Sequence, residues 1–166
     1  MDALREAREA LREATPLKGD CGRLCGARCC SSMEGEETGM LLFPGEERYY
    51  EGKPGWRVKA GEAGLLVICP GRCERLARPL SCRLFPVLPR ETAEGVQVWM
   101  DFRARAVCPL ARQGTEGLAP AFLEAVIRAG EALIKEEEQR DFLNRLHREQ
   151  EEWKRIARQL RGGDHV

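Results

Sequence analysis

The chain has 166 residues, of which 43% are apolar and 6% aromatic, so it is long enough for one domain with a modest core and an appendage. Lys and Arg together number 27, as do Asp and Glu, and the formal net charge is zero. This balance argues against a nucleic-acid partner, because neutralising phosphates requires an excess of basic residues.

The N-terminal residues do not have the pattern of a secretory signal. Residues 2–6 are mostly charged, whereas a signal peptide has an apolar stretch after a basic start. The longest apolar run, residues 65–68, has the length of a strand and is far shorter than the ~20 residues that span a bilayer. We therefore expect a cytoplasmic bacterial protein without membrane contact.

The apolar pattern predicts short elements in the first half of the chain. Residues 3–14 have the spacing of an amphipathic helix, which Pro16 ends. Residues 40–43 and 65–68 are predicted as short strands, the second of them buried, with a turn-rich segment over 52–61 between them.

A β-hairpin and a helical segment are predicted to follow. Residues 84–88 and 96–102 form the expected hairpin arms, joined by a polar connection. From Pro120 onward, apolar residues recur at helical spacing, with a charged interruption over 135–141. Three later residues lie seven apart, as in a coiled-coil seam, although two repeats are too few to define one: Leu146, Trp153 and Leu160. This segment either packs on its own domain or binds an unidentified protein partner.

The eight cysteines are the most informative feature. Four form a C-x3-C-x3-C-C box, two form a C-x3-C box, and two stand alone: Cys21, Cys25, Cys29, Cys30, Cys69, Cys73, Cys82 and Cys108. In a reducing cytosol they are expected to be free thiols. Zinc and iron–sulfur clusters take thiolate ligands, typically four at a time. We therefore predict that all eight bind metal, as zinc or an iron–sulfur cluster in one or two sites.

The spacing bears on how these ligands are grouped. A helical first box would place Cys21, Cys25 and Cys29 on one face, whereas Gly22 and Gly26 also allow a loop. The adjacent Cys29 and Cys30 point in different directions, so they suit two sites or a bridged dinuclear site. Arginines near the cysteines are expected to offset thiolate charge and donate hydrogen bonds to sulfur: Arg23, Arg28, Arg72, Arg75, Arg78 and Arg83.

Other chemistry is less well supported by the sequence. The sequence contains no C-x-x-C motif, which argues against a thioredoxin-type redox pair. A cysteine nucleophile needs a histidine partner, and the two histidines, His147 and His165, are expected to be exposed. A carboxylate ligand from the acidic run Glu34, Glu36 and Glu37 is an alternative to a solvated loop. Asp101, Arg103 and Arg105 are the one polar set that would suit an enzyme.

Three stretches resemble the YkgJ-type cysteine-cluster family, whose members are described as zinc- or iron-chelating and often as iron–sulfur proteins. They are the first box, residues 78–86 (R-P-L-S-C-R-L-F-P), and residues 108–110 (C-P-L). The first three cysteines of the first box are separated by three residues where the family has two. This difference affects the expected ligand geometry more than the expected metal binding. The resemblance implies a metal site and assigns no reaction.

Together these features predict an α+β fold with a small, irregular, cysteine-rich core and short strands, flanked by an N-terminal helix and a long C-terminal helix or helix pair. The expected divisions are a helix over 1–16, a metal-binding domain over 17–116, a helical segment over 117–161 and a disordered tail over 162–166. The expected function is a metal-binding, non-catalytic protein of electron transfer, metal handling or sensing. A structural zinc module that presents its C-terminal helix, and an enzyme with catalysis at the cluster, are the alternatives.

Overall fold

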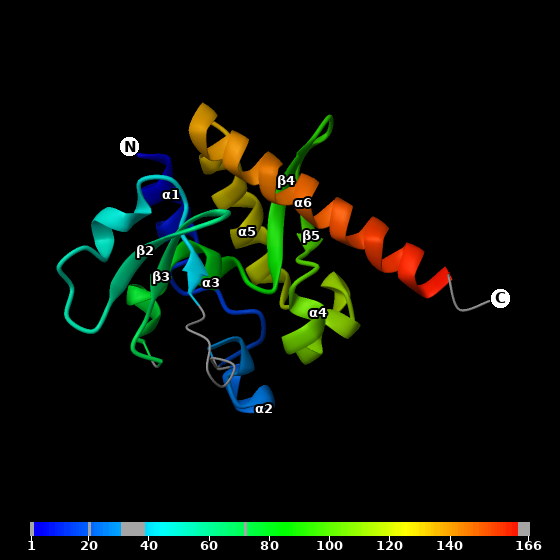
Figure 1. The fold of residues 1–166 in the computed structure, drawn as a ribbon, viewed down its shortest axis with the longest axis horizontal. Coiled ribbons are helices and arrows are strands. Elements are labelled where there is room, and N and C mark those ends of the chain that lie inside the picture. The colour runs from blue at the N-terminus through cyan, green and yellow to red at the C-terminus, as the bar shows by residue number, and fades with distance from the viewer. Residues whose placement is uncertain (1, 20, 31–38, 72, 163–166) are drawn as a thin grey trace.

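The fold is known from a computed structural model that describes residues 2–19, 21–30, 39–71 and 73–162 (Figure 1). It confirms the predicted α+β class. The helices are α1 (Ala3–Ala10), α2 (Gly22–Cys25), α3 (Leu80–Leu84), α4 (Ala104–Val107), α5 (Pro120–Leu133) and α6 (Glu137–Gly162). The strands are β1 (Met40–Leu41), β2 (Arg57–Gly61), β3 (Gly64–Ile68), β4 (Val87–Thr92) and β5 (Gly95–Met100).

Two small antiparallel sheets form the β part. The first has the order β1-β3-β2, with Leu41 opposite Leu66 and Val58 opposite Val67. Its central strand is only partly buried, contrary to expectation: Val67 is buried but Leu65 is 38% exposed. One face of this sheet covers only a small cluster, formed by Leu42, Tyr50, Trp56 and Val67.

The second sheet is the predicted hairpin, β4 paired with β5 from Val87 opposite Met100 to Thr92 opposite Gly95. Its first arm begins later than expected, because Leu84 ends the short helix α3 instead of starting a strand. The arm also continues through Pro89 to Thr92, so the connection is a two-residue turn instead of the longer loop predicted over 89–95.

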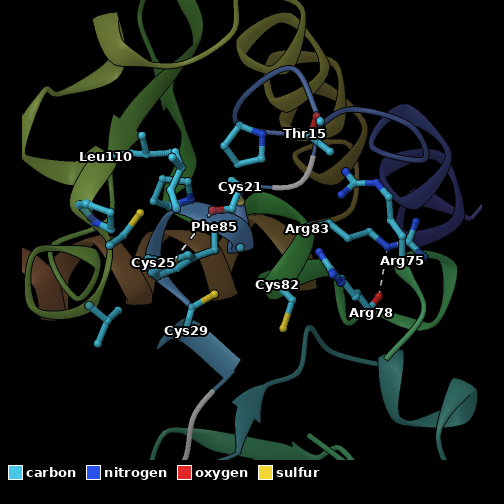
Figure 2. A pocket seen from close by; sticks show the side chains of 18 residues that line it. Thr15, Cys21, Cys25, Cys29, Arg75, Arg78, Cys82, Arg83, Phe85 and Leu110 are labelled. Atoms are coloured by element: carbon cyan, nitrogen blue, oxygen red, sulfur yellow. Dashed lines mark hydrogen bonds between the residues drawn. The ribbon is translucent and has the colours of Figure 1, made fainter. Parts of the chain in front are cut away.

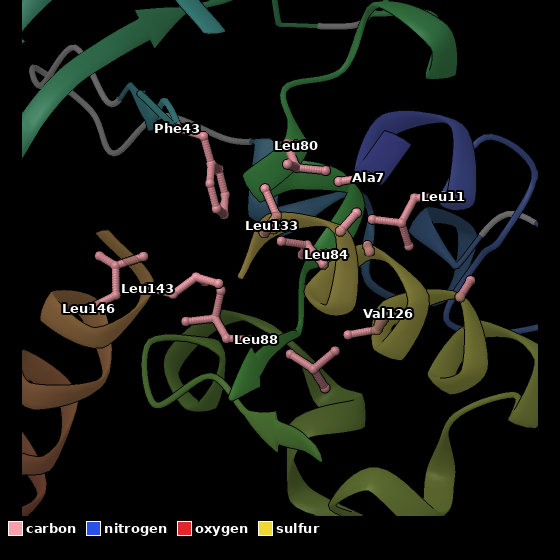
Figure 3. Packing of buried hydrophobic residues seen from close by; sticks show 14 of the residues in the cluster. Ala7, Leu11, Phe43, Leu80, Leu84, Leu88, Val126, Leu133, Leu143 and Leu146 are labelled. Carbon is pink, nitrogen blue, oxygen red and sulfur yellow. The ribbon is translucent and has the colours of Figure 1, made fainter. Parts of the chain in front are cut away.

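One hydrophobic cluster joins elements from both ends of the chain (Figure 3). Leu4, Ala7 and Leu11 come from the N-terminal helix region, and Leu80 and Leu84 come from α3. Helix α5 and helix α6 complete the cluster with Phe122, Val126, Leu133, Phe142, Leu143 and Leu146. The N-terminal helix and the C-terminal segment therefore hold α3, which carries Cys82, from two sides.

Helix α1 ends at Ala10, four residues before the predicted end. Two arginines from the cysteine region bind the carbonyl groups where it ends: Arg83 donates to Arg8 O at 2.9 Å and Arg75 donates to Arg12 O at 3.0 Å. Such guanidinium groups satisfy carbonyls that a helix leaves without partners at its C-terminus. Tertiary contacts therefore satisfy carbonyl groups where α1 ends.

Helix α6 is packed on the body in its first half and extends beyond the hairpin in its second half (Figure 1). Leu146 is buried, whereas Trp153 is 48% and Leu160 73% exposed. His147 is only 8% exposed, so the expectation of a solvent-exposed histidine was wrong. Among the helices described, none is long and apolar enough to cross a membrane.

Candidate metal centre

The first cysteine box is a broken helix. Helix α2 ends at Gly26, which has a left-handed φ of 63° and donates its N–H to Gly22 O. Ala27 is also left-handed, with φ of 55°, and a 3₁₀ turn then spans Arg28–Cys30. Cys21, Cys25 and Cys29 therefore do not lie along one continuous helix. The reversal at Gly26 instead folds the box back on itself.

This folding places the three residues on one cavity of about 280 Å³ (Figure 2). Cys82 from α3 and Cys108 from the segment after α4 also line it, so five thiols come from three separate parts of the chain. Three arginines share the lining: Arg75, Arg78 and Arg83. The cavity thus brings soft donors together beside positive charge.

Cys69 and Cys73 occupy a neighbouring position. Cys69 follows β3, and both side chains pack against the small cluster under the three-stranded sheet. Burial, and then the charge of Cys69, raises the pKa of Cys73, while Arg78 opposes that rise by hydrogen bonding and by its charge. The charge of Cys30 contributes to the same rise, so these three thiols lie near one another.

Cys82 lies between this group and the cavity. Burial raises its thiol pKa first, followed by the charges of Cys30, Cys73 and Cys69. For Cys29 the largest cause of a raised pKa is a hydrogen bond with Cys30, followed by burial and by the charges of Cys30, Cys21 and Cys25. Crowded thiols resist losing protons together unless a cation neutralises them, and a bound metal deprotonates its thiol ligands.

A buried acid positions the helix of Cys82. Glu46 is 0% exposed and accepts hydrogen bonds from the backbone N–H groups of Leu80 at 2.7 Å and Phe43 at 3.2 Å. The guanidinium of Arg8 donates to the same carboxylate at 2.5 Å. Sequence reasoning missed Glu46, because two of these three partners, Leu80 and Arg8, are 34 and 38 residues away and leave no local pattern.

Arg83, in the segment that carries the family resemblance, is a buried structural donor. It donates to the carbonyls of Arg78, Arg8 and Leu76 at 3.0, 2.9 and 2.6 Å. Burial, and then the charge of Arg8, lowers its pKa to about 10, so it is still a cation at neutral pH. It lines the cavity as a fixed positive charge.

The other predicted site residues are distributed as follows. Arg28 lines a second pocket, of about 300 Å³, together with Cys25, Cys108, Arg105 and Arg112. Arg23 is exposed. Arg72, His165 and the acidic residues Glu34, Glu36 and Glu37 lie outside the described residues.

The polar set suggested for an enzyme comes together only in part. Asp101 is buried and pairs with Arg103 at 2.6 Å, while Arg105 lies over the ring of Phe102 and faces the second pocket. The Asp101 carboxylate also accepts from the backbone N–H of Arg103 at 2.9 Å. Asp101 therefore stabilises the turn after β5 by accepting hydrogen bonds from Arg103.

The donor set fits a soft metal in its chemistry, since all eight cysteines are free thiols and five of them face one cavity. The side-chain arrangement is not that of a closed site. Within the described ranges, no three His, Cys, Asp or Glu side chains are gathered closely enough to hold one ion. Metal binding would therefore draw the thiols inward from the walls they now occupy.

Comparisons of the chain with protein-family models, with curated proteins and with solved structures find no match. The resemblance to the YkgJ-type family thus rests on the three motifs quoted above, and it stays a hypothesis.

Proposed function

We propose that this protein binds metal through its cysteines and is non-catalytic, with a role in electron transfer, metal handling or sensing. The observation that supports the proposal is the convergence of five thiols from three chain segments on one cavity. Unrelated buried cysteines would be scattered through the core as small apolar residues. Here the Cys29 thiol is hydrogen-bonded with Cys30, Cys21 and Cys25 lie near Cys29, and Cys108 lines the same cavity.

The bound group is proposed to be an iron–sulfur cluster or zinc. An iron–sulfur cluster supplies one-electron redox chemistry, whereas zinc supplies a rigid link between chain segments. The residues that would hold it are the eight cysteines. Arg75, Arg78 and Arg83 would offset thiolate charge, and hydrogen bonds and charge near the ligands tune such sites. We favour iron–sulfur slightly, because the family description inclines that way and Cys108-Pro109 is compatible with the Cys-Pro end of ferredoxin cysteine runs, although the C-x2-C repeats of ferredoxins are absent.

Anaerobic purification from iron-replete medium tests the proposal. A brown protein with stoichiometric iron and sulfide supports the iron–sulfur form, and a colourless protein saturated with zinc supports the zinc form. The matched control is Ala106→Ser, an exposed change two residues from Cys108, which should keep the full metal content. Protein that contains neither metal, and takes up none after reconstitution under reducing conditions, would show that the proposal is wrong.

A second candidate is a structural zinc module that presents α6 to a protein partner. The exposed apolar residues at the end of α6 favour it: Trp153, Ile156 and Leu160. Under this alternative the metal is zinc alone, and replacing these three residues with polar ones leaves the metal content unchanged while abolishing association. A measurable reduction potential of the bound metal would argue against this alternative, because zinc has no redox chemistry.

A further inference from the structure

We propose that the eight cysteines form two separate four-thiolate sites that adjoin at Cys29 and Cys30. The first site comprises Cys21, Cys25, Cys29 and Cys108. The second comprises Cys30, Cys69, Cys73 and Cys82. This grouping rests on the proposed function, since it matters only if the thiols bind metal.

The first set shares one wall of the fold. All four of its members line the 280 Å³ cavity. Cys21 and Cys108 also pack against the main hydrophobic cluster, although they are far apart in the sequence. Cys25 and Cys108 line the second pocket together, so α2 and the segment after α4 adjoin there. Cys108 is therefore the distant ligand that closes a site begun by the first box.

The second set belongs to the other side of α3. Cys69 and Cys73 pack against the small cluster under the three-stranded sheet, not against the main one. Cys82 is close enough to Cys30, Cys73 and Cys69 for their charges to act on it. The charges of Cys69 and Cys30 likewise raise the pKa of Cys73. Cys69 and Cys73, which share a place against the small cluster, are therefore grouped with Cys30 and Cys82.

The two sets meet where the chain places two cysteines in succession. Cys29 and Cys30 lie in a 3₁₀ turn, in which consecutive side chains point about 120° apart. Cys29 lines the cavity with Cys21 and Cys25, whereas the charge of Cys30 raises the pKa of Cys73 and of Cys82. One turn therefore supplies one ligand to each site and holds the two sites next to each other.

Arginines lie beside both sets. Four thiolates around a divalent ion carry a net negative charge, which guanidinium groups beside the site can offset. The Arg78 side chain hydrogen-bonds the Cys73 thiol, and its buried Nε has no hydrogen-bond partner in the described part of the chain. Arg28 lines the second pocket beside Cys25 and Cys108. The positive charge is thus distributed over both sites.

One rival grouping uses Cys82 in the first site in place of Cys108, because Cys82 also lines the cavity (Figure 2). It would leave Cys108 beside Cys25 without a metal and would leave the second set with three thiols. The two groupings predict different partners for Cys82, and this difference can be measured.

The test counts ions in the reduced, full-length protein reconstituted with zinc, using native mass spectrometry. The parent should bind two zinc ions. Cys25→Ser, Cys108→Ser and the double variant of both should each retain one, as should Cys69→Ser, Cys82→Ser and their double variant. The double variant Cys25→Ser/Cys82→Ser should retain none. Cobalt-loaded variants should likewise lose about half of the thiolate-to-cobalt absorption in each single case.

The outcomes separate the two proposals. One zinc ion in the parent, or loss of both ions in the Cys25→Ser/Cys108→Ser protein, overturns the grouping and leaves metal binding intact. Retention of one ion by Cys25→Ser/Cys82→Ser assigns both to the same site and also overturns it. A parent that binds no zinc, cobalt or iron overturns the proposed function itself. If serine variants do not fold, cadmium NMR of the parent decides, because two sites give two signals from four-sulfur coordination.

Discussion

The buried carboxylate of Glu46 accepts a hydrogen bond at 2.7 Å from the backbone N–H of Leu80, the first residue of α3. The same oxygen receives the guanidinium of Arg8 from α1. Two residues after Leu80, the helix carries Cys82 to the cavity. A charged pair that has no chemistry of its own therefore orients one of the predicted metal ligands.

Glu46→Gln should destabilise the protein by about 3–5 kcal/mol, because it leaves Arg8 without its buried partner and turns an amide N–H₂ toward a backbone donor. Urea unfolding measures this loss. The control is Glu9→Gln, which removes an exposed pair with Arg12 and should change the free energy of unfolding by less than about 0.5 kcal/mol. Equal effects of the two substitutions would show that Glu46 does not hold α3.

Cys82→Ser should lower the stability of the metal-loaded protein by several kcal/mol, since apparent zinc affinities in small cysteine sites reach about 10–16 kcal/mol. At about 2–4 °C per kcal/mol for a chain of this size, the melting temperature should fall by roughly 10 °C or more. Calorimetry with and without a chelator provides the control. The variant and the parent should melt within a few degrees of each other once metal is removed. An equal melting temperature in the metal-loaded forms would identify Cys82 as an ordinary buried thiol.

Gly130→Ala should destabilise the protein, although alanine is the better helix former by about 1 kcal/mol. A methyl group at Gly130 would lie 2.6 Å from Cβ of Pro89 and 2.7 Å from Cγ1 of Val96, so α5 could not keep its close approach to the hairpin. Overpacking of this kind costs about 1–3 kcal/mol. The matched control is Ala121→Gly on the exposed side of α5, which should cost only the helix propensity. A gain in stability from Gly130→Ala, measured by urea unfolding, would contradict the packing.

His147 should make stability depend on pH. Burial lowers the pKa of His147, a hydrogen bond to Pro89 O at 2.8 Å opposes that shift, Arg90 and Lys154 add to it, and Asp101 opposes it. In the unfolded chain the imidazole takes up a proton near pH 6.5, whereas the folded protein resists it. The contribution is therefore fully present above about pH 6.5 and is lost progressively as the pH falls from there through the lower pKa of the folded state.

His147→Gln should remove this dependence, because an amide can still donate to Pro89 O and does not titrate. The measurement is the difference in unfolding free energy between about pH 7.5 and 5.5. That difference should be smaller in the variant than in the parent. Identical differences in the two proteins would show that His147 titrates alike in the folded and unfolded states.

Several elements were determined by the sequence itself. The apolar spacing around Phe122 and Val126 predicts α5, because a helix must bury residues that recur every three or four positions. The alternation over 96–102 predicts β5, with a boundary that differs by a residue or two. The sequence also shows which donor atoms are available, since thiols are a property of residue type, and five of the eight cysteines line the cavity.

Only the tertiary structure decided which cysteines face one another and which polar residues hold them. Helix α3 was not predicted, because five residues carry too little periodicity, and its last residue, Leu84, was expected to begin a strand. Glu46 accepts a hydrogen bond from the backbone at the start of this helix, and Arg83 within it donates to the carbonyl of Arg78. The burial of His147 depends on Pro89, 58 residues earlier in the chain. Such contacts join segments that are distant in sequence, and their energies come from burial and hydrogen bonding in the folded state, which leave no local pattern of residues to read.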